Sequence, residues 1–309
     1  MKEHSRYEMK VCGALIKRNV TMFFKDKGTF FTSLITPIIL LVLYVTFLYN
    51  VYEDSFCSEL PPQIIQENES LIKGMIGGVL LSSLLAVSAV TVPFCANLFM
   101  VQDKVTGARS DLSIAPIKAS SIAFGYYVAT VINGLIISFV AVAMGLVYLS
   151  IIGWYLSFTD VLLLLSDVVL LVLFGTALSS LICYPLSSQG AMSAVGTIVS
   201  SGYGFICGAY MPISTFSKGL QNTLAFLPGT HGTSLLRNHA LSGVFEAMAE
   251  KGIPAEAVEK LRGAADCQLS FFGHDVEKWV MYLVLIGAVV LLVGAYVLIT
   301  ALAERKNRK

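Results

Sequence analysis

The segment VQDKVTGARSDLSIAPIK, residues 101–118, is a short charged stretch between two long apolar runs. Asp103 is expected near the start of a helix, where a carboxylate stabilises the partial positive charge of the helix N-terminus. Leu112 and Ile114 offer apolar contacts, and Pro116 is expected to end the helix. A simple solvated loop fits the same residues. The segment therefore indicates either a docking surface for a soluble partner or a plain loop.

The composition around this segment is that of a membrane protein. The chain has 309 residues, of which 56% are hydrophobic and 13% are charged, whereas a soluble domain carries about 25% charged residues. Six apolar runs are long enough to cross about 30 Å of hydrocarbon as helices. We therefore expect a single all-α integral membrane domain covering residues 1–309. The six predicted spans are residues 29–50, 73–100, 119–152, 158–184, 191–211 and 277–303.

The charges between these spans predict the orientation. Residues 1–28 hold seven Lys or Arg side chains, and their spacing predicts an amphipathic helix in the membrane interface, with a basic juxtamembrane tail as the alternative. Residues 51–72 hold five acidic side chains and no basic one, so the positive-inside rule places this loop outside. Both termini, including the tail 304–309, and the segment 101–118 are then cytoplasmic.

The stretch after the fifth predicted span is too broken by Pro and Gly for a straight span. Residues 212–243 are expected to form short re-entrant or interfacial helices, since irregular backbone at membrane depth must be covered by protein or water. Residues 244–276 have a soluble character and predict two short helices, with Pro254 near the start of the second.

Several enzyme classes are excluded by missing motifs. The chain contains no GxxxxGK[ST] phosphate-binding loop, so it cannot hydrolyse ATP by itself. HExxH and GxSxG are also missing, and no Cys/His spacing predicts a metal site. The basic residues lie beside the spans instead of forming one patch, which argues against nucleic acid as a partner.

Polar side chains inside the predicted spans are candidates for a transport path. Asp167 is the one carboxylate well inside a span, where a charge is costly unless it faces water or a partner; a structural ion pair or hydrogen bond is the alternative. Asn133 and the hydroxyl groups could instead join helices or bond to their own backbone. The path candidates are Ser82, Ser83, Ser88, Thr91, Asn133, Asp167, Ser193, Thr197, Ser200 and Ser201.

Cys57 and Cys267 are the two cysteines in segments predicted to lie outside. An oxidising exterior would allow them to form a disulfide. Two unrelated thiols are the alternative, because the sequence does not give their separation.

The order of these features resembles the membrane subunit of an ABC transporter of the ABC-2 type. One family motif is similar to the spacing of Asp103, Gly107, Leu112 and Pro116, followed by Gly125, although the family usually has Glu at the acidic position. A second family pattern is similar to Pro228, Arg237 and Gly243, preceded by Pro212, with Leu227 replacing the usual Asn.

The resemblance implies a function and its partners. Residues 101–118 would form a coupling helix that docks on a separate cytosolic ATPase subunit, which binds ATP and Mg²⁺. A second permease chain, identical or related, would complete the path within the lipid bilayer, and the substrate would be a drug-like, peptide or lipid amphiphile. The implied coupling residues are Asp103, Lys104, Gly107, Arg109, Asp111, Leu112 and Pro116.

Two other functions stay open on the residues alone. The chain could be an ion-coupled transporter or channel in which Asp167 relays protons. It could also be an intramembrane enzyme or a scaffold, although it shows no catalytic constellation.

Overall fold

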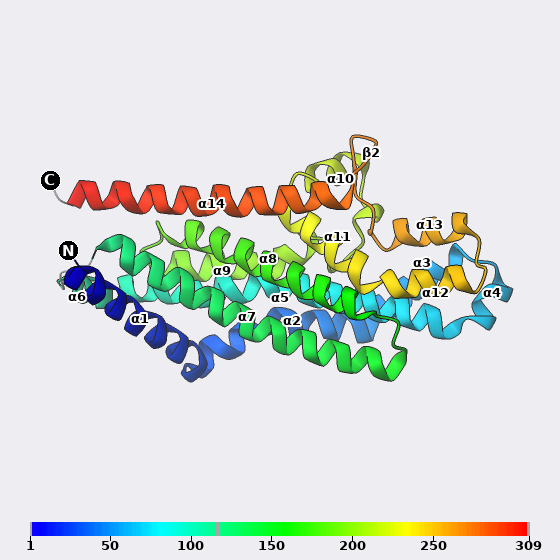
Figure 1. The fold of residues 1–309 in the computed structure, drawn as a ribbon, viewed down its shortest axis with the longest axis horizontal. Helices are drawn as coiled ribbons and strands as arrows, with labels where there is room; N and C mark the ends of the chain where they lie inside the picture. Colours follow the sequence, from blue (N-terminus) through cyan, green and yellow to red (C-terminus); the bar gives the residue numbers. More distant parts are fainter. Residues whose placement is uncertain (1, 115–117, 308–309) are drawn as a thin grey trace.

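Helix α5 (Glu69–Val105) is the central element of the molecule, and most other long helices pack around it (Figure 1). The computed structural model describes residues 2–114 and 118–307. The 18 most apolar residues of α5 are all buried, which explains why this segment is hydrophobic on every side of the helix. Helices α7 (Ala119–Ile152), α8 (Phe158–Cys183) and α11 (Pro228–Ala240) contact it along its length.

Within the described residues, five helices are long and apolar enough to cross a membrane. The all-helical membrane architecture is therefore confirmed. The bounds of α7 and α8 agree with the predicted spans 119–152 and 158–184, whereas α5 extends beyond its predicted span at both ends. The five spanning segments are Lys27–Ser58, Glu69–Val105, Ala119–Ile152, Phe158–Cys183 and Lys278–Ala303.

The first spanning segment is longer than predicted. Helix α2 (Lys27–Leu43) continues through the π-helical turn η1 (Tyr44–Leu48) into α3 (Tyr49–Ser58). The prediction that residues 51–58 belong to a loop was wrong, because Tyr52 and Phe56 lie one helical turn apart and are both buried in the core. Glu53 and Asp54, two of the acidic residues that suggested a loop, lie on the less buried faces of the same helix.

Helix α9 (Gln189–Ile206) lies in the predicted fifth span but has only 18 residues and is not one of the five apolar helices. It ends earlier than the predicted residue 211, because Gly208 adopts a positive φ of 78° and turns the chain. Tyr203 and Gly204 are its only buried residues, so α9 is a lightly packed helix.

The N-terminal segment forms one helix, α1 (Lys2–Lys25), which packs on α7. Leu15, Asn19 and Phe23 are buried and lie on one face, whereas Lys10 and Lys17 are exposed. Asp26 ends α1 and caps α2 by accepting a hydrogen bond of 3.2 Å from the Thr29 amide.

The chain between α9 and the last helix, α14 (Lys278–Asn307), folds into short elements. The two short helices predicted in residues 244–276 are confirmed as α12 and α13, and Pro254 is the N-cap of α13. A small antiparallel strand pair before α14 was not predicted. The remaining elements are α4 (Pro62–Glu67), α6 (Ala108–Ile114), η2 (Ile213–Thr215), α10 (Lys218–Leu224), α12 (Ser242–Glu250), α13 (Ala255–Ala264), β1 (Ser270–Phe271) and β2 (His274–Asp275).

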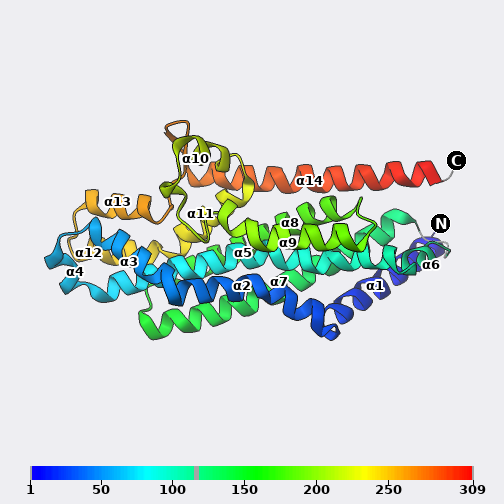
Figure 2. The same ribbon diagram turned by 180° about the vertical axis from the view of Figure 1, so that it is seen from behind.

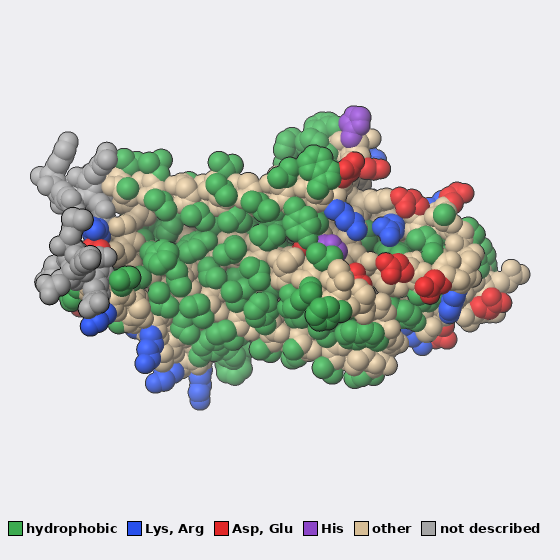
Figure 3. Space-filling view, in the orientation of Figure 1, with side chains coloured by type: hydrophobic (Ala, Val, Ile, Leu, Met, Phe, Trp, Pro, Cys, Tyr) green, Lys and Arg blue, Asp and Glu red, His purple; other side chains and the backbone are tan. Residues whose placement is uncertain are grey.

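Both ends of the chain lie at one end of the elongated molecule, close to α6, and we call this the proximal end (Figures 1 and 2). Helices α4, α12 and α13 lie at the opposite, distal end. Figure 3 shows a wide hydrophobic band between the two ends, with basic side chains on the proximal part and acidic and basic side chains on the distal part. This distribution suits a protein that crosses a bilayer.

Candidate functional site

The candidate coupling helix is shorter than predicted and begins later. Helix α5 continues to Val105, Gly107 turns the chain with a φ of 84°, and α6 occupies Ala108–Ile114. The prediction that the helix begins near Asp103 was wrong, because α5 keeps its helical hydrogen bonds through this residue and ends with Thr106 N–H donating to Gln102 O at 2.9 Å. Pro116, predicted to end the helix, lies outside the described residues.

Asp103 is buried and holds three helices together. Its two carboxylate oxygens accept hydrogen bonds from the Arg18 guanidinium of α1 at 2.7 and 2.9 Å. The Tyr126 hydroxyl of α7 donates to the same carboxylate. The hydrogen bonds that the Arg18 guanidinium donates to Asp103 raise the pKa of Arg18. This bidentate geometry favours Arg over Lys, and it corrects the expectation that Asp103 faces a soluble partner.

Two basic residues of the segment also have partners inside the protein. Lys104 donates to the backbone carbonyls of Tyr184 and Leu186 in the turn between α8 and α9, the latter at 3.1 Å. The Arg109 guanidinium lies 5.8 Å from the ring centre of Tyr126, within cation–π range. Lys104 and Arg109 therefore fix α5 and α6 to neighbouring helices instead of projecting freely from the surface.

Asp111 and Leu112 are the remaining candidate positions of α6. Asp111 is exposed, whereas Leu112 is half-buried against an apolar cluster that includes Leu15, Met100 and Tyr126. Next to this cluster, the Lys118 ammonium lies 3.3 Å from the Glu8 carboxylate and joins the start of α7 to α1. These contacts hold α1, α5, α6 and α7 together at the proximal end, and Asp111 is exposed on its surface.

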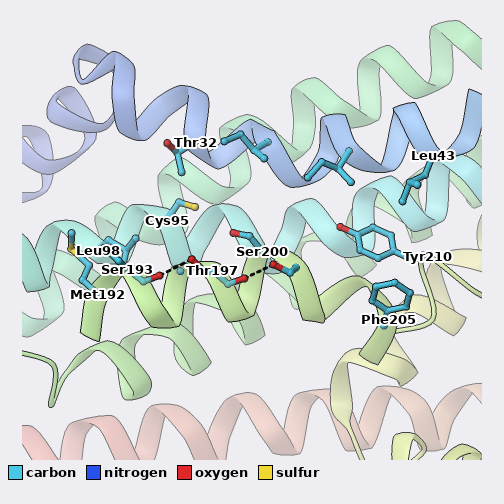
Figure 4. A pocket seen from close by; sticks show the side chains of 14 residues that line it. Thr32, Leu43, Cys95, Leu98, Met192, Ser193, Thr197, Ser200, Phe205 and Tyr210 are labelled. Atoms are coloured by element: carbon cyan, nitrogen blue, oxygen red, sulfur yellow. Dashed lines mark hydrogen bonds between the residues drawn. The ribbon is translucent and has the colours of Figure 1, made fainter. Parts of the chain in front are cut away.

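A groove of about 590 Å³ lies between α2, α5 and α9 (Figure 4). Four of the predicted path residues line it from one face of α9. Thr197 donates to Ser193 O at 2.9 Å and Ser201 donates to Thr197 O at 2.7 Å, so their donors are used while their oxygens can still accept. The four lining hydroxyl residues are Ser193, Thr197, Ser200 and Ser201.

The opposite wall of the groove is mainly apolar. It is lined by Ile35, Ile39 and Leu43 of α2. Phe205 and Tyr210 lie at one end of the groove with their ring centres 5.1 Å apart in an edge-on arrangement. Such a surface suits a largely apolar molecule that carries a few hydrogen-bond donors.

A second, almost wholly apolar hollow of about 450 Å³ lies on the other side of α9. It is lined by Ile198, Val199 and Ile206 of α9 and by side chains of α8 and α14, such as Phe174 and Leu291. Helix α9 therefore separates a groove with a polar stripe from a hollow without one.

The hydroxyl residues of α5 that were predicted to line a path are buried inside the bundle and do not line the groove. Ser82 and Thr91 are buried and donate to backbone carbonyls of their own helix, each at 2.9 Å. Ser83 and Ser88 are equally buried, as is Asn133 of α7. None of the five is among the residues that line the groove.

Asp167 is also buried away from the groove, in contacts that the sequence did not reveal. One carboxylate oxygen lies 2.6 Å from His239 Nδ1 of α11, and the other accepts a hydrogen bond of 2.7 Å from the Tyr282 hydroxyl of α14. Asp167 is fully buried. These contacts are those of the alternative interpretation of Asp167, in which a hydrogen-bonded carboxylate joins three helices.

Arg237 of the second sequence pattern is fully buried and binds Asp266. Arg237 Nη1 lies 2.8 Å from the Asp266 carboxylate, and Nη2 donates to Gly208 O at 2.6 Å and to Ser83 Oγ at 3.4 Å. Asp266 also accepts the Ile213 amide at 2.7 Å. The guanidinium therefore joins α11 to the chain that leaves α9.

The other residues of this pattern have structural roles. Pro228 is the first residue of α11, where its missing N–H costs no helical hydrogen bond. Pro212 is the N-cap of η2. A Cβ on Gly243 would lie 1.7 Å from the Tyr155 carbonyl oxygen, so only glycine fits between α12 and the turn after α7.

The predicted disulfide is not formed. All six cysteines of the chain lie in the described residues and are free thiols. Cys57 is half-buried, whereas Cys267 is buried, and this burial raises the pKa of Cys267 to about 12. The carbonyl of Cys267 accepts hydrogen bonds from Ser234 and Asn238 of α11, which fixes its position.

The fold and these sites define a multi-pass helical membrane protein with a lateral groove and with helices that are linked by side-chain contacts at the proximal end. The family model of the ABC-2 type transporter matches residues 10–240, well over half of the 309 residues, and the chain belongs to this family. The chain is thus a permease subunit of an ABC transporter and not the ATPase itself. No curated protein matched the sequence.

Proposed function

We propose that the chain is the permease subunit of an ATP-driven exporter, powered by separate cytosolic subunits that bind ATP and Mg²⁺. The observation that carries this proposal is the direct link between α6 and the rest of the protein. Helix α5 runs as one helix of 37 residues from the distal half to the turn before α6. A displacement of α6 therefore moves the buried centre of the bundle.

The proximal end has the contacts that such a transmission requires. Asp103 joins α5 to α1 and α7, and Lys104 joins α5 to the turn before α9. Closure of an ATPase pair against α6 would push these helices as one body, the kind of rigid-body motion used by transporters. The exposed Asp111 is the charge that we expect the ATPase to contact.

We propose six membrane crossings, with α9 as the sixth. Both termini lie at the proximal end (Figures 1 and 2), and an even number of crossings is required to bring them there. The five apolar helices alone would leave the termini on opposite sides. The basic residues of α1 support a cytoplasmic proximal end, with α1 at the membrane interface.

We propose that the groove between α2, α5 and α9 is one half of the translocation path. Small residues and hydroxyl groups on α9 gain little from facing lipid, whereas they allow close approach of another helix. A second permease chain, identical or related, would cover this face. The mixed lining indicates an amphiphile such as a drug-like molecule, a peptide or a lipid.

Asp167 does not favour the ion-coupled alternative. Both of its oxygens have partners, His239 and Tyr282, and it lies outside the groove. A proton relay would require a connection from this carboxylate to water on both sides of the membrane. We therefore assign Asp167 to the packing of α8, α11 and α14.

Copurification with the cognate ATPase, followed by reconstitution into vesicles, tests the proposal. Dye export is expected to require ATP and to persist when the proton gradient is collapsed. Asp111→Arg on the exposed side of α6 is expected to weaken ATPase binding, whereas Glu256→Arg on α13, also exposed but distal, should have no effect. Export that continues without ATP and stops when the gradient collapses would refute the proposal.

A further inference from the structure

Three phenylalanines, two of them exposed and one half-buried, form a cluster that projects from the distal half of the molecule, and we call it the aromatic corner. Phe226 follows α10, while Phe271 and Phe272 belong to the β1–β2 hairpin. The ring centre of Phe271 lies 4.7 Å from that of Phe226 and 4.8 Å from that of Phe272, both edge-on. Phe226 and Phe272 are each 63% exposed. Aromatic rings that pack on one another and remain this exposed indicate a surface made for a partner.

The backbone holds the corner outward at a conformational cost. Phe272 has a φ of 49° and Gly273 a φ of 84°, so they form the two central residues of the hairpin turn. Such a turn favours Asn-Gly, and a bulky side chain at positive φ is unusual. The Phe272 amide donates to Asn222 Oδ1 of α10 at 3.0 Å, which fixes the hairpin. An unfavourable residue held in place in this way points to a role for its side chain.

The corner lies beside the start of the spanning helix α14 (Figure 1). Trp279, in the first turn of this helix, is 60% exposed. The other tryptophan, Trp154, is also exposed and follows the distal end of α7. Tryptophan is enriched at the membrane–water interface. The two tryptophans therefore mark the distal membrane surface independently of the corner.

The part of the molecule that carries the aromatic corner has an apolar side and a polar side, as a segment at a membrane surface requires. Figure 3 shows hydrophobic side chains on its side toward the spanning helices, and histidine and acidic side chains on its side toward the distal end. The neighbouring helix α14 also exposes apolar side chains, with Leu283 and Val290 at 58% and 65% exposure. The corner therefore lies next to a helix whose exposed residues suit contact with lipid.

We propose that the aromatic corner inserts into the boundary between headgroups and acyl chains of the distal leaflet. The partner is the lipid surface itself. The corner then fixes α10 and η2, the segment that joins α9 to α11, at a constant depth in the bilayer. This inference needs only that α14 crosses the membrane, and it does not depend on the direction or energy source of transport.

Tryptophan fluorescence in vesicles tests the insertion. The reporter is Phe272→Trp in a background that carries Trp154→Phe and Trp279→Phe, reconstituted into phosphatidylcholine with brominated acyl chains. We expect shallow bromines, close to the headgroups, to quench its emission more strongly than deep bromines, and aqueous iodide to quench it weakly. Phe226→Trp in the same background should give the same result, so the test does not rest on one variant.

Two further proteins calibrate this measurement. A protein with only Trp154→Phe retains Trp279 and reports the signal of an interfacial tryptophan. Glu250→Trp in the double Phe background places the reporter at the exposed last position of α12, at the distal end, and should respond to iodide but not to brominated lipid. The proposal is overturned if both corner reporters respond like Glu250→Trp. It is equally overturned if both are protected from iodide and from brominated lipid, since a protein partner such as a second copy would then cover the corner.

Discussion

Loss of the buried Arg237–Asp266 pair is expected to destabilise the permease strongly. Arg237→Met removes an ion pair of 2.8 Å and hydrogen bonds to Gly208 and Ser83, in a site where both charged side chains are at most 4% exposed. Breaking a buried pair by removing one partner costs about 3–5 kcal/mol. Asp266 keeps two backbone amide donors, so we expect the lower part of that range, about 3 kcal/mol.

The thermal unfolding midpoint in detergent measures this effect. A loss of about 3 kcal/mol corresponds to a decrease of roughly 6–12 °C, taking roughly 2–4 °C per kcal/mol for a larger domain. A dye that fluoresces on reaction with thiols can follow unfolding, because Cys95, Cys183, Cys207 and Cys267 are buried. These thiols react only when the surrounding helices separate.

The exposed pair Lys260–Glu256 provides a matched control. Its atoms lie 3.2 Å apart on α13, with side chains 55% and 83% exposed. Lys260→Met should therefore cost less than about 1 kcal/mol. Asp266→Asn combined with Arg237→Met should cost less than the sum of the single changes, because the two groups act as one unit. An Arg237→Met midpoint equal to that of Lys260→Met would refute the structural role of the pair.

Three other predictions follow from the described contacts. Gly243→Ala should abolish folded protein, whereas Gly287→Ala on α14, where an added Cβ meets no atom within 4 Å, should leave the yield in gel filtration unchanged. In the folded protein at pH 7, a maleimide should label Cys57 but not Cys267, because the pKa of about 12 keeps that buried thiol protonated. A protein mass lower by two hydrogens, restored by a reductant, would show a disulfide and contradict the free thiols. Thr197→Val keeps the size of the side chain but removes its hydroxyl from the groove, and should lower export without lowering the unfolding midpoint. Unchanged export in that variant would argue against the groove as the path.

The helical membrane architecture could be predicted because its signals are local. An apolar run followed by Gly153, which adopts a φ of 152°, marks the end of α7. Ser157 and Asp160 form a capping box that starts α8. Length, hydrophobicity and turn residues are properties of neighbouring positions, so the bounds of these two helices needed no knowledge of the tertiary structure.

The functions of buried polar groups could not be predicted, because their partners are distant in the sequence. Asp103 was interpreted as a surface charge, but its partner Arg18 lies 85 positions earlier. One local signal was available. Leu15 and Asn19 are buried residues of one face of α1. Arg18 lies three positions after Leu15 and directly before Asn19, so helical spacing places it at the edge of this buried face.

The predicted path residues of α9 and those of α5 could not be distinguished in the sequence either, because the difference depends on tertiary contacts. Hydroxyl groups on α9 line the groove, whereas those on α5 are enclosed by surrounding helices. Both sets look alike in sequence, since Ser and Thr in an apolar helix can face a cavity or bond to their own backbone. What distinguishes them is the number of neighbours around each helix, and this depends on the whole bundle.

The contrast between α5 and α9 has an evolutionary consequence. Substitutions on α5 must fit a tightly packed interior, where most changes of volume are destabilising. Substitutions on the groove side of α9 have more room, because a Cβ added to Gly196, which lines the groove, would come no closer than 3.7 Å to its nearest neighbour, Leu98. In the proposed function, new substrate preferences can therefore accumulate on α9 while α5, which we propose to carry the motion, stays unchanged. Recognition and movement would then lie on separate helices, so that one can diversify without loss of the other.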